Sequence, residues 1–172
     1  TSSAACARKF LHAPEVVSRY SFNAVLVGSG NRERPLESNE AVNVDNAFFM
    51  IKDYLSASPD LITTEHLVAL DPEEALTDAQ KTALSSAGNK GWYLTLGSGN
   101  HDAEQVVTSS VVVGGMAYFS THAPKTPSDD EIKVCGANLG TARGYAVNFL
   151  DGAGFDNGER YELPFELLRV ES

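Results

Sequence analysis

Four oxygen-bearing side chains near the end of the chain could bind a metal ion. Asp151, Asp156, Asn157 and Glu159 lie close together in a glycine-rich stretch. Ca²⁺ takes six to eight hard oxygen ligands, and carboxylate and amide oxygens on a loop supply them. We therefore predict a calcium site at these residues. The alternative is a plain surface turn, since Asp156-Asn157-Gly158 is also an ordinary turn sequence.

A second group places one imidazole and two carboxylates within four residues. His101, Asp102 and Glu104 could ligate a divalent metal. No second cluster of ligands accompanies them, and they fall in an expected turn between two strands. A solvated loop is therefore the expected reading of this segment.

Two Gly-Ser-Gly triplets, at residues 28–30 and 97–99, resemble parts of catalytic motifs. A phosphate loop needs more glycines, a following helix and, in the Walker form, a lysine. A nucleophile elbow needs Gly-x-Ser-x-Gly between a strand and a helix. Neither spacing is present, so we expect turn glycines. The four histidines are scattered, and no Ser-His-Asp arrangement follows from their spacing.

The two cysteines, Cys6 and Cys135, leave two possibilities open. They form a disulfide if the protein is exported and stay free thiols if it is cytosolic, and spacing alone cannot choose. No Cys-x-x-Cys motif for zinc or redox chemistry occurs.

The charge balance restricts the class of partner. The formal net charge is −10, and nucleic-acid binders need clustered Lys and Arg. We therefore expect no nucleic-acid partner. No apolar run approaches the ~20 residues of a membrane-spanning helix, so we expect no membrane span. The chain begins Thr1-Ser2-Ser3, which we read as the start of an excised or processed piece.

Short apolar segments separated by turns must position these side chains, and they predict strands. Gly114-Gly115 predicts a tight hairpin, because a two-residue turn needs positive φ angles. A helix is expected over 77–84, with Thr77 or Asp78 as N-cap and Gly88 as the stop. Residues 61–68 fit either a strand or an early helix. The expected strands cover about residues 15–17, 22–30, 46–53, 91–96, 104–113, 116–121, 140–150 and 160–170.

The order of these strands predicts an all-β fold made of β-propeller blades. A four-stranded unit used twice is the propeller pattern, and a blade takes ~40–50 residues. We expect one blade at about 8–53, a short helical insertion at 54–90, a second blade at 91–152 and a tail at 153–172. A closed ring needs at least four blades. The remaining blades would come from the same chain or from a companion chain.

Five blocks of the sequence carry a family resemblance. The blocks are Arg8–Val17, Ala24–Leu36, Phe48–Asp53, Gly91–Leu96 and Asn138–Asn148. Together they resemble the C-terminal propeller of the PilY1/PilC type IV pilus biogenesis proteins, whose corresponding motifs include VGSGDREHP at the second block, FYMIKD at the third and GW-L-L at the fourth. The blocks occur in the family's order over about residues 8–152.

The resemblance implies a secreted, modified propeller that acts at the pilus tip, on the cell surface or in the periplasm. It implies a non-catalytic role in pilus assembly or adhesion, with minor pilins and a host surface as partners. The implied export favours a bridge between Cys6 and Cys135, tying the entry segment to the loop at 122–142. Some members carry an Asp-x-Asp-x-Asp calcium loop or an Arg-Gly-Asp tripeptide, and this sequence contains neither.

The alternative function is catalytic. Propeller enzymes such as quinoprotein-like dehydrogenases share the same strand pattern, as do other secreted propellers. Such an enzyme needs a cofactor in the central channel with charged residues converging on it. The ordered pilus-family blocks favour the binding module.

Overall fold

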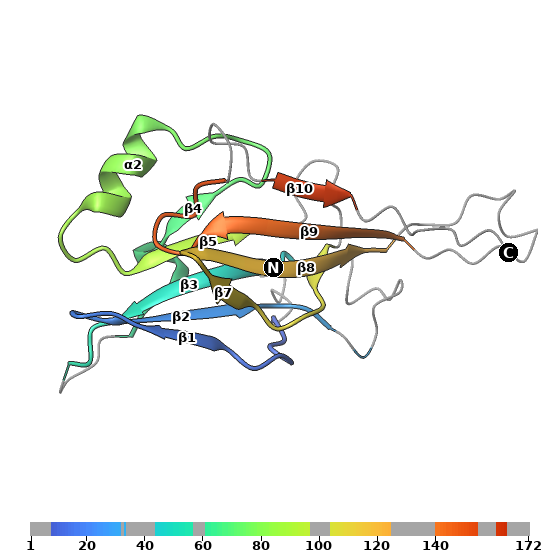
Figure 1. Ribbon diagram of the computed structural model, residues 1–172, viewed down its shortest axis with the longest axis horizontal. Coiled ribbons are helices and arrows are strands. Elements are labelled where there is room, and N and C mark those ends of the chain that lie inside the picture. Colours follow the sequence, from blue (N-terminus) through green and yellow to red (C-terminus); the bar gives the residue numbers. More distant parts are fainter. Residues whose placement is uncertain are drawn as a thin grey trace, which may run out of the picture.

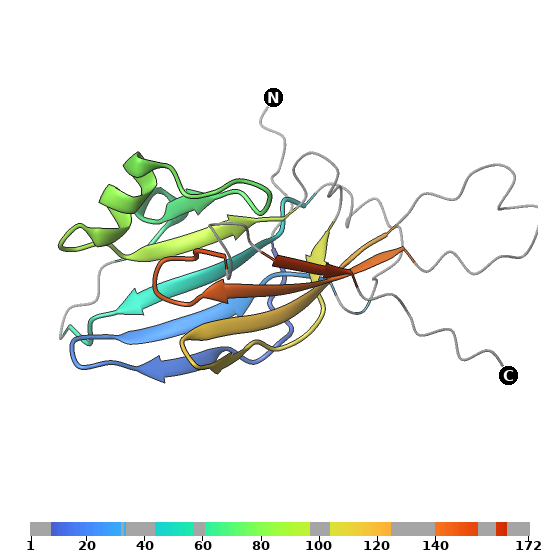
Figure 2. The same ribbon diagram turned by 45° about the horizontal axis from the view of Figure 1, so that its top comes forward.

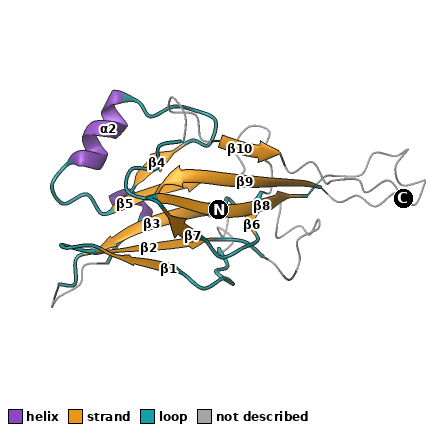
Figure 3. Cartoon of the chain, in the orientation of Figure 1, coloured by secondary structure: helices purple, strands orange, loops and turns teal. Residues whose placement is uncertain are grey.

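The fold is mainly β, with one short α-helix in the part of the chain that is described (Figures 1 and 3). The structure is a computed structural model of the 172-residue chain. It describes residues 8–31, 33, 44–56, 61–96, 104–124, 140–154 and 161–164, the last range as backbone only. The predicted all-β class is confirmed at this level.

The first sheet is formed by the N-terminal half of the chain. Its strand order is β1 (Glu15–Ser18), β2 (Asn23–Gly28), β3 (Ala47–Asp53), β5 (Gly91–Thr95) and β4 (Val68–Leu70). Neighbours are antiparallel except β4 and β5, which are parallel. The predicted strands at 15–17, 22–30 and 46–53 are confirmed.

The second sheet is formed by the C-terminal half. Its order is β10 (Tyr161–Pro164), β9 (Thr141–Asn148), β8 (Met116–Ala123) and β6 (Gln105–Val106), and β7 (Val111–Val113) pairs with a different part of β8. All of these pairings are antiparallel.

The predicted hairpin at Gly114-Gly115 joins β7 to β8. The φ angles of the two glycines are 61° and 87°. Only glycine adopts such angles without strain, so the turn explains both residues.

The two sheets face each other across one apolar core, and Figure 2 shows the second sheet (gold to red) in front of the first (blue to green). The rings of Phe48 and Phe119 stack between the sheets with centroids 3.8 Å apart. Trp92 is fully buried, and its indole N–H donates to the Phe149 carbonyl at 3.3 Å. Alternation along the strands explains this core, because residues two apart share a face. The core includes Ala24, Leu26, Phe48, Met50, Leu70, Leu84, Trp92, Leu94, Leu96, Val106, Ala117, Phe119, Tyr145, Val147 and Phe149.

The first sheet meets the second closely where β2 ends. A Cβ on Gly28 would lie 2.5 Å from the Val106 side chain, and one on Gly30 would clash with the Val106 carbonyl. The Val106 N–H donates to the Ser29 carbonyl at 3.0 Å. The glycines here permit a close approach of two backbones.

The predicted helix is confirmed within one residue as α2 (Asp78–Ser85). Thr77 is its N-cap and forms a capping box with Gln80, which satisfies two backbone N–H groups. Gly88, at φ 90°, follows the helix end. The Gln80 side chain also donates to the Ala69 carbonyl at 2.8 Å, which holds α2 beside β4 (Figure 1).

Two expectations about the strands need correction. The long strand expected at 104–113 is divided into β6 and β7, because the Thr108 hydroxyl accepts the Ser120 N–H and interrupts the ladder. Residues 91–96 were expected in the second blade, but β5 pairs with β3 in the first sheet.

The segment 61–68, for which a strand and a helix were both open, contains a piece of each. A 3₁₀-helix, η1 (Thr64–His66), precedes β4. The predicted insertion at 54–90 therefore supplies an edge strand of the first sheet. In the described ranges, no helix is long and apolar enough to cross a membrane.

Candidate functional site

A groove of about 410 Å³ lies between α2, the turn that joins β1 to β2, the end of β3 and the turn after β9. Three basic side chains line it: Arg19, Lys52 and Lys81. Asp151 also lines it. The volume falls within the range of small-ligand sites, ~300–1,000 Å³.

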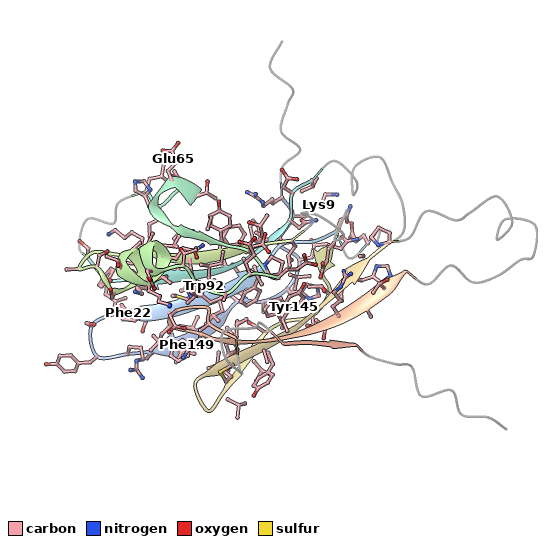
Figure 4. All side chains as sticks on the ribbon, turned by 90° about the horizontal axis from the view of Figure 1, so that it is seen from above. Lys9, Phe22, Glu65, Trp92, Tyr145 and Phe149 are labelled. Atoms are coloured by element: carbon pink, nitrogen blue, oxygen red, sulfur yellow. The ribbon has the colours of Figure 1, made fainter. Side chains whose placement is uncertain are left out.

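The floor of the groove is apolar. Figure 4 places Phe22 and Phe149 at the end of the molecule that carries α2. Phe22 packs against the ring of Tyr54 with centroids 5.6 Å apart. The apolar lining residues are Phe22, Leu76, Leu84 and Leu150.

Local hydrogen bonds fix the two turns that bring charges to the groove. The Arg19 N–H donates to the Phe22 carbonyl at 2.9 Å and closes the turn between β1 and β2. The Asp151 carboxylate accepts the Ala153 N–H at 2.9 Å. Gly152, at φ 70°, completes this second turn with an N–H bond to the Asn148 carbonyl at 2.7 Å.

Lys52 is the most enclosed of the three basic groups. Its ammonium donates to Asn89 Oδ1 at 2.8 Å and lies 5.6 Å from the centre of the Phe22 ring. Burial lowers the pKa of Lys52 from its usual 10.5, because the charged ammonium loses water contacts.

The other two basic groups are more exposed. The Arg19 guanidinium lies 5.9 Å from the centre of the Phe149 ring, and it has no ion pair with a residue that the structure describes. Lys81 pairs with Asp78 at 3.2 Å, and both side chains are exposed. An exposed pair of this kind contributes little to stability.

The predicted calcium residues are only partly tested. Asp151 lines the groove and binds a backbone N–H of its own turn. Asp156, Asn157 and Glu159 lie outside the described residues, so the calcium site stays a prediction. Within the described residues no three His, Cys, Asp or Glu side chains gather as a metal site would require.

Of the remaining residues singled out in the sequence, some lie in the described part of the chain and others lie outside it. Cys6 and Cys135, like His101 and Asp102, lie outside the described residues, so the bridge stays a prediction. Ser29 is buried; its hydroxyl donates to Asn46 Oδ1 at 3.0 Å and accepts the Ala47 N–H at 2.9 Å.

Glu104, a candidate metal ligand in the sequence, instead points into the core of the second sheet. It is fully buried and accepts hydrogen bonds from Arg143 at 3.0 Å, from the Tyr145 hydroxyl at 2.9 Å and from the Thr121 hydroxyl. Both carboxylate oxygens are thus engaged within the chain. Figure 4 shows Tyr145 inside the molecule.

Sequence reasoning missed this network and the groove. Arg143 and Tyr145 are two residues apart on β9, so one face carries both, and this alternation was the available signal for the network. The groove residues come from four separate segments of the chain. The local sequence of each segment does not predict that the four lie together in the fold.

Comparison with known proteins finds a similar fold in a solved structure and no match by sequence. No family model matches the chain, and no curated protein matches it significantly. One solved structure matches, the C-terminal domain of Pseudomonas aeruginosa PilY1, with a TM-score of 0.61 and 15% sequence identity. The match covers 88% of this chain and 33% of that chain, so this chain spans about a third of that domain's length. The resemblance seen in the sequence is therefore confirmed at the level of the fold: this chain has the fold of a part of the PilY1 C-terminal domain.

Proposed function

We propose that this chain supplies blades of a PilY1-like β-propeller and acts as a non-catalytic binding module of a type IV pilus. The observation that carries the proposal is the fold similarity to PilY1 over 88% of the chain. The five sequence blocks, which occur in the family's order, support it independently. In this reading the protein works outside the cytoplasm, at the pilus tip, on the cell surface or in the periplasm.

The outer face of the first sheet supports a blade. Val25 and Ile51 are opposite each other on β2 and β3, and Val27 is opposite Phe49. Val25, Val27 and Ile51 are half-buried, although they point away from the core. A sheet that is apolar on both faces is suited to lie between two layers.

The outer face of the second sheet is apolar as well. Val111 and Tyr118 are opposite each other on β7 and β8 and are 51% and 39% exposed, and Val113 is 61% exposed. Exposed apolar side chains that cluster mark an interaction surface. A neighbouring blade, from the same or a companion chain, would cover them.

The proposed partners are minor pilins, with a host surface as a further contact. To test this, the protein as the cell makes it is immobilised and mixed with purified minor pilins, and sheared pilus fractions are probed for it with an antibody. We expect retention of at least one minor pilin and presence in the pilus fraction. Failure of both would overturn the proposal.

The same preparation tests the catalytic alternative. A quinoprotein-like dehydrogenase holds an organic cofactor that absorbs visible or near-ultraviolet light. We expect a spectrum of protein alone. A stoichiometric bound chromophore would favour the enzyme over the binding module.

A further inference from the structure

The groove beside α2 has a local charge opposite to that of the whole chain. The chain carries a formal net charge of −10, yet the described charged residues that line the groove are Arg19, Lys52 and Lys81 and one carboxylate, Asp151. Basic side chains gathered in a concave site raise the local concentration of an anionic partner.

The described side chains leave much of this positive charge without a counter-ion. The guanidinium of Arg19 lies 5.9 Å from the centre of the Phe149 ring and has no ion pair with a described residue. Lys52 is held by the neutral Asn89 amide at 2.8 Å. Of the three, Lys81 alone has a carboxylate partner among the described residues, Asp78 on its own helix at 3.2 Å.

Burial lowers the pKa of Lys52. Burial removes water from this ammonium, and within the described part of the chain its hydrogen-bond partner is the neutral Asn89 amide rather than a carboxylate. A carboxylate arriving in the groove would stabilise the charged form and raise the pKa again.

The apolar floor restricts the anion further. Phe22, Leu76, Leu84 and Leu150 line the groove together with the basic groups. A small inorganic anion would leave this floor in contact with water, whereas a ligand that also carries an apolar group would cover it. Nucleic acid is disfavoured because the −10 chain repels a dense polyanion.

We propose that this groove binds an acidic peptide segment of a partner protein, with carboxylate side chains facing Arg19, Lys52 and Lys81 and an apolar side chain on Phe22 and Leu84. The segment belongs to another protein and is recognised through Glu or Asp next to a large aliphatic residue. This inference goes beyond the pilus assignment and does not depend on it, because it is argued from the described side chains that line the groove.

The test uses three fluorescent hexapeptides with both termini capped, so that side chains alone supply charge. One alternates Glu and Leu, the second Gln and Leu, and the third Glu and Ser. Fluorescence anisotropy against the whole chain measures each affinity. We expect the Glu–Leu peptide to bind, and the other two to bind about tenfold more weakly or less. Equal binding of the Glu–Leu and Gln–Leu peptides, or of the Glu–Leu and Glu–Ser peptides, would overturn the proposal.

Single substitutions then assign binding to the groove. Arg19→Gln and Lys81→Gln should each weaken the Glu–Leu peptide about two- to fivefold, the scale of one exposed charge contact. Asp151→Asn should strengthen it by a similar factor, because the change removes a repelling carboxylate and keeps an acceptor for the Ala153 N–H. Both basic residues and Asp151 lie on turns or an exposed helix face, so these variants should fold.

Lys9→Gln is the matched control. It removes the same charge from an exposed residue that does not line the groove and lies away from Phe22 (Figure 4). It should leave the affinity unchanged within about twofold. If Lys9→Gln weakens binding as much as Arg19→Gln, or if Asp151→Asn has no effect, binding is not at this groove and the proposal fails. Pilin retention plays no part in this readout, so the two proposals fail separately.

Discussion

The Glu104–Arg143 pair is an ion pair enclosed by the second sheet, since the two side chains are 0% and 13% exposed. Taking both charges out of water is expensive, and the hydroxyls of Thr121 and Tyr145 help to offset that cost. Removal of Arg143 leaves the buried Glu104 carboxylate without this cationic partner, although the two hydroxyls still donate to it. The network therefore makes the second sheet sensitive to single substitutions.

Arg143→Met should lower the free energy of unfolding by about 3–5 kcal/mol, the usual effect of breaking a buried pair. Urea denaturation followed by tryptophan fluorescence measures it, because Trp92 is buried in the same core. Lys81→Met breaks an exposed pair and should leave the midpoint unchanged. Equal effects of the two substitutions would contradict the role given to burial.

Lys52 predicts a pH dependence whose sign follows from its lowered pKa. Between that lowered value and 10.5, the unfolded chain binds more protons than the folded chain. Stability should therefore rise with pH across this window, as the enclosed ammonium loses its proton. The measurement is the unfolding free energy of the wild type minus that of Lys52→Met, taken from neutral pH to above 10.5. A difference that stays flat or falls would contradict the lowered pKa.

At the scale of elements, Gly91 controls the pairing of β5 with β3. Its φ is 125°, and a Cβ there would clash with the Met50 carbonyl of the neighbouring strand. Gly88 also has positive φ, at 90°, but a Cβ there would meet nothing within 4 Å. Substitution of Gly88 therefore tests backbone strain alone, whereas substitution of Gly91 adds a steric clash with the neighbouring strand.

Gly88→Ala should destabilise the fold by about 1–2 kcal/mol, the strain of positive φ alone. Gly91→Ala should cost about 1–3 kcal/mol more, because the first sheet must also move apart. Thermal unfolding of both variants checks the difference. Equal destabilisation by the two substitutions would contradict the close contact between Gly91 and the Met50 carbonyl.

Elements with local signals could be predicted from the sequence. Thr77 and Gly88 bound α2 because capping and positive φ are properties of a few neighbouring residues. The Gly114-Gly115 hairpin is predictable for the same reason. Pairings between distant segments could not be predicted. Val68–Leu70 pairs in parallel with Gly91–Thr95, and this pairing depends on tertiary packing rather than on the local sequence of either strand.

The candidate site depends even more on long-range packing. Arg19 and Asp151 are far apart in the sequence, and each lies in a turn whose own residues explain the turn. Their shared groove exists only once both sheets are assembled. The calcium prediction concerned one of these residues, Asp151, for a different reason.

At the scale of the whole molecule, the chain holds two sheets with a shared core and apolar outer faces. Val111 and Val113 remain 51% and 61% exposed on the second sheet. In a ring, each sheet lies between two others, and such faces are covered. In an isolated two-layer sandwich they would stay in water, where exposed apolar patches favour association.

The most direct test of the propeller account is a cryo-electron microscopy structure of the protein as the cell makes it, with every chain that copurifies. We predict that the two sheets follow each other as blades around a common axis, with Val111, Val113 and Tyr118 covered by the next sheet. A two-layer sandwich with Val111, Val113 and Tyr118 open to solvent and no further sheet stacked on it would contradict the account.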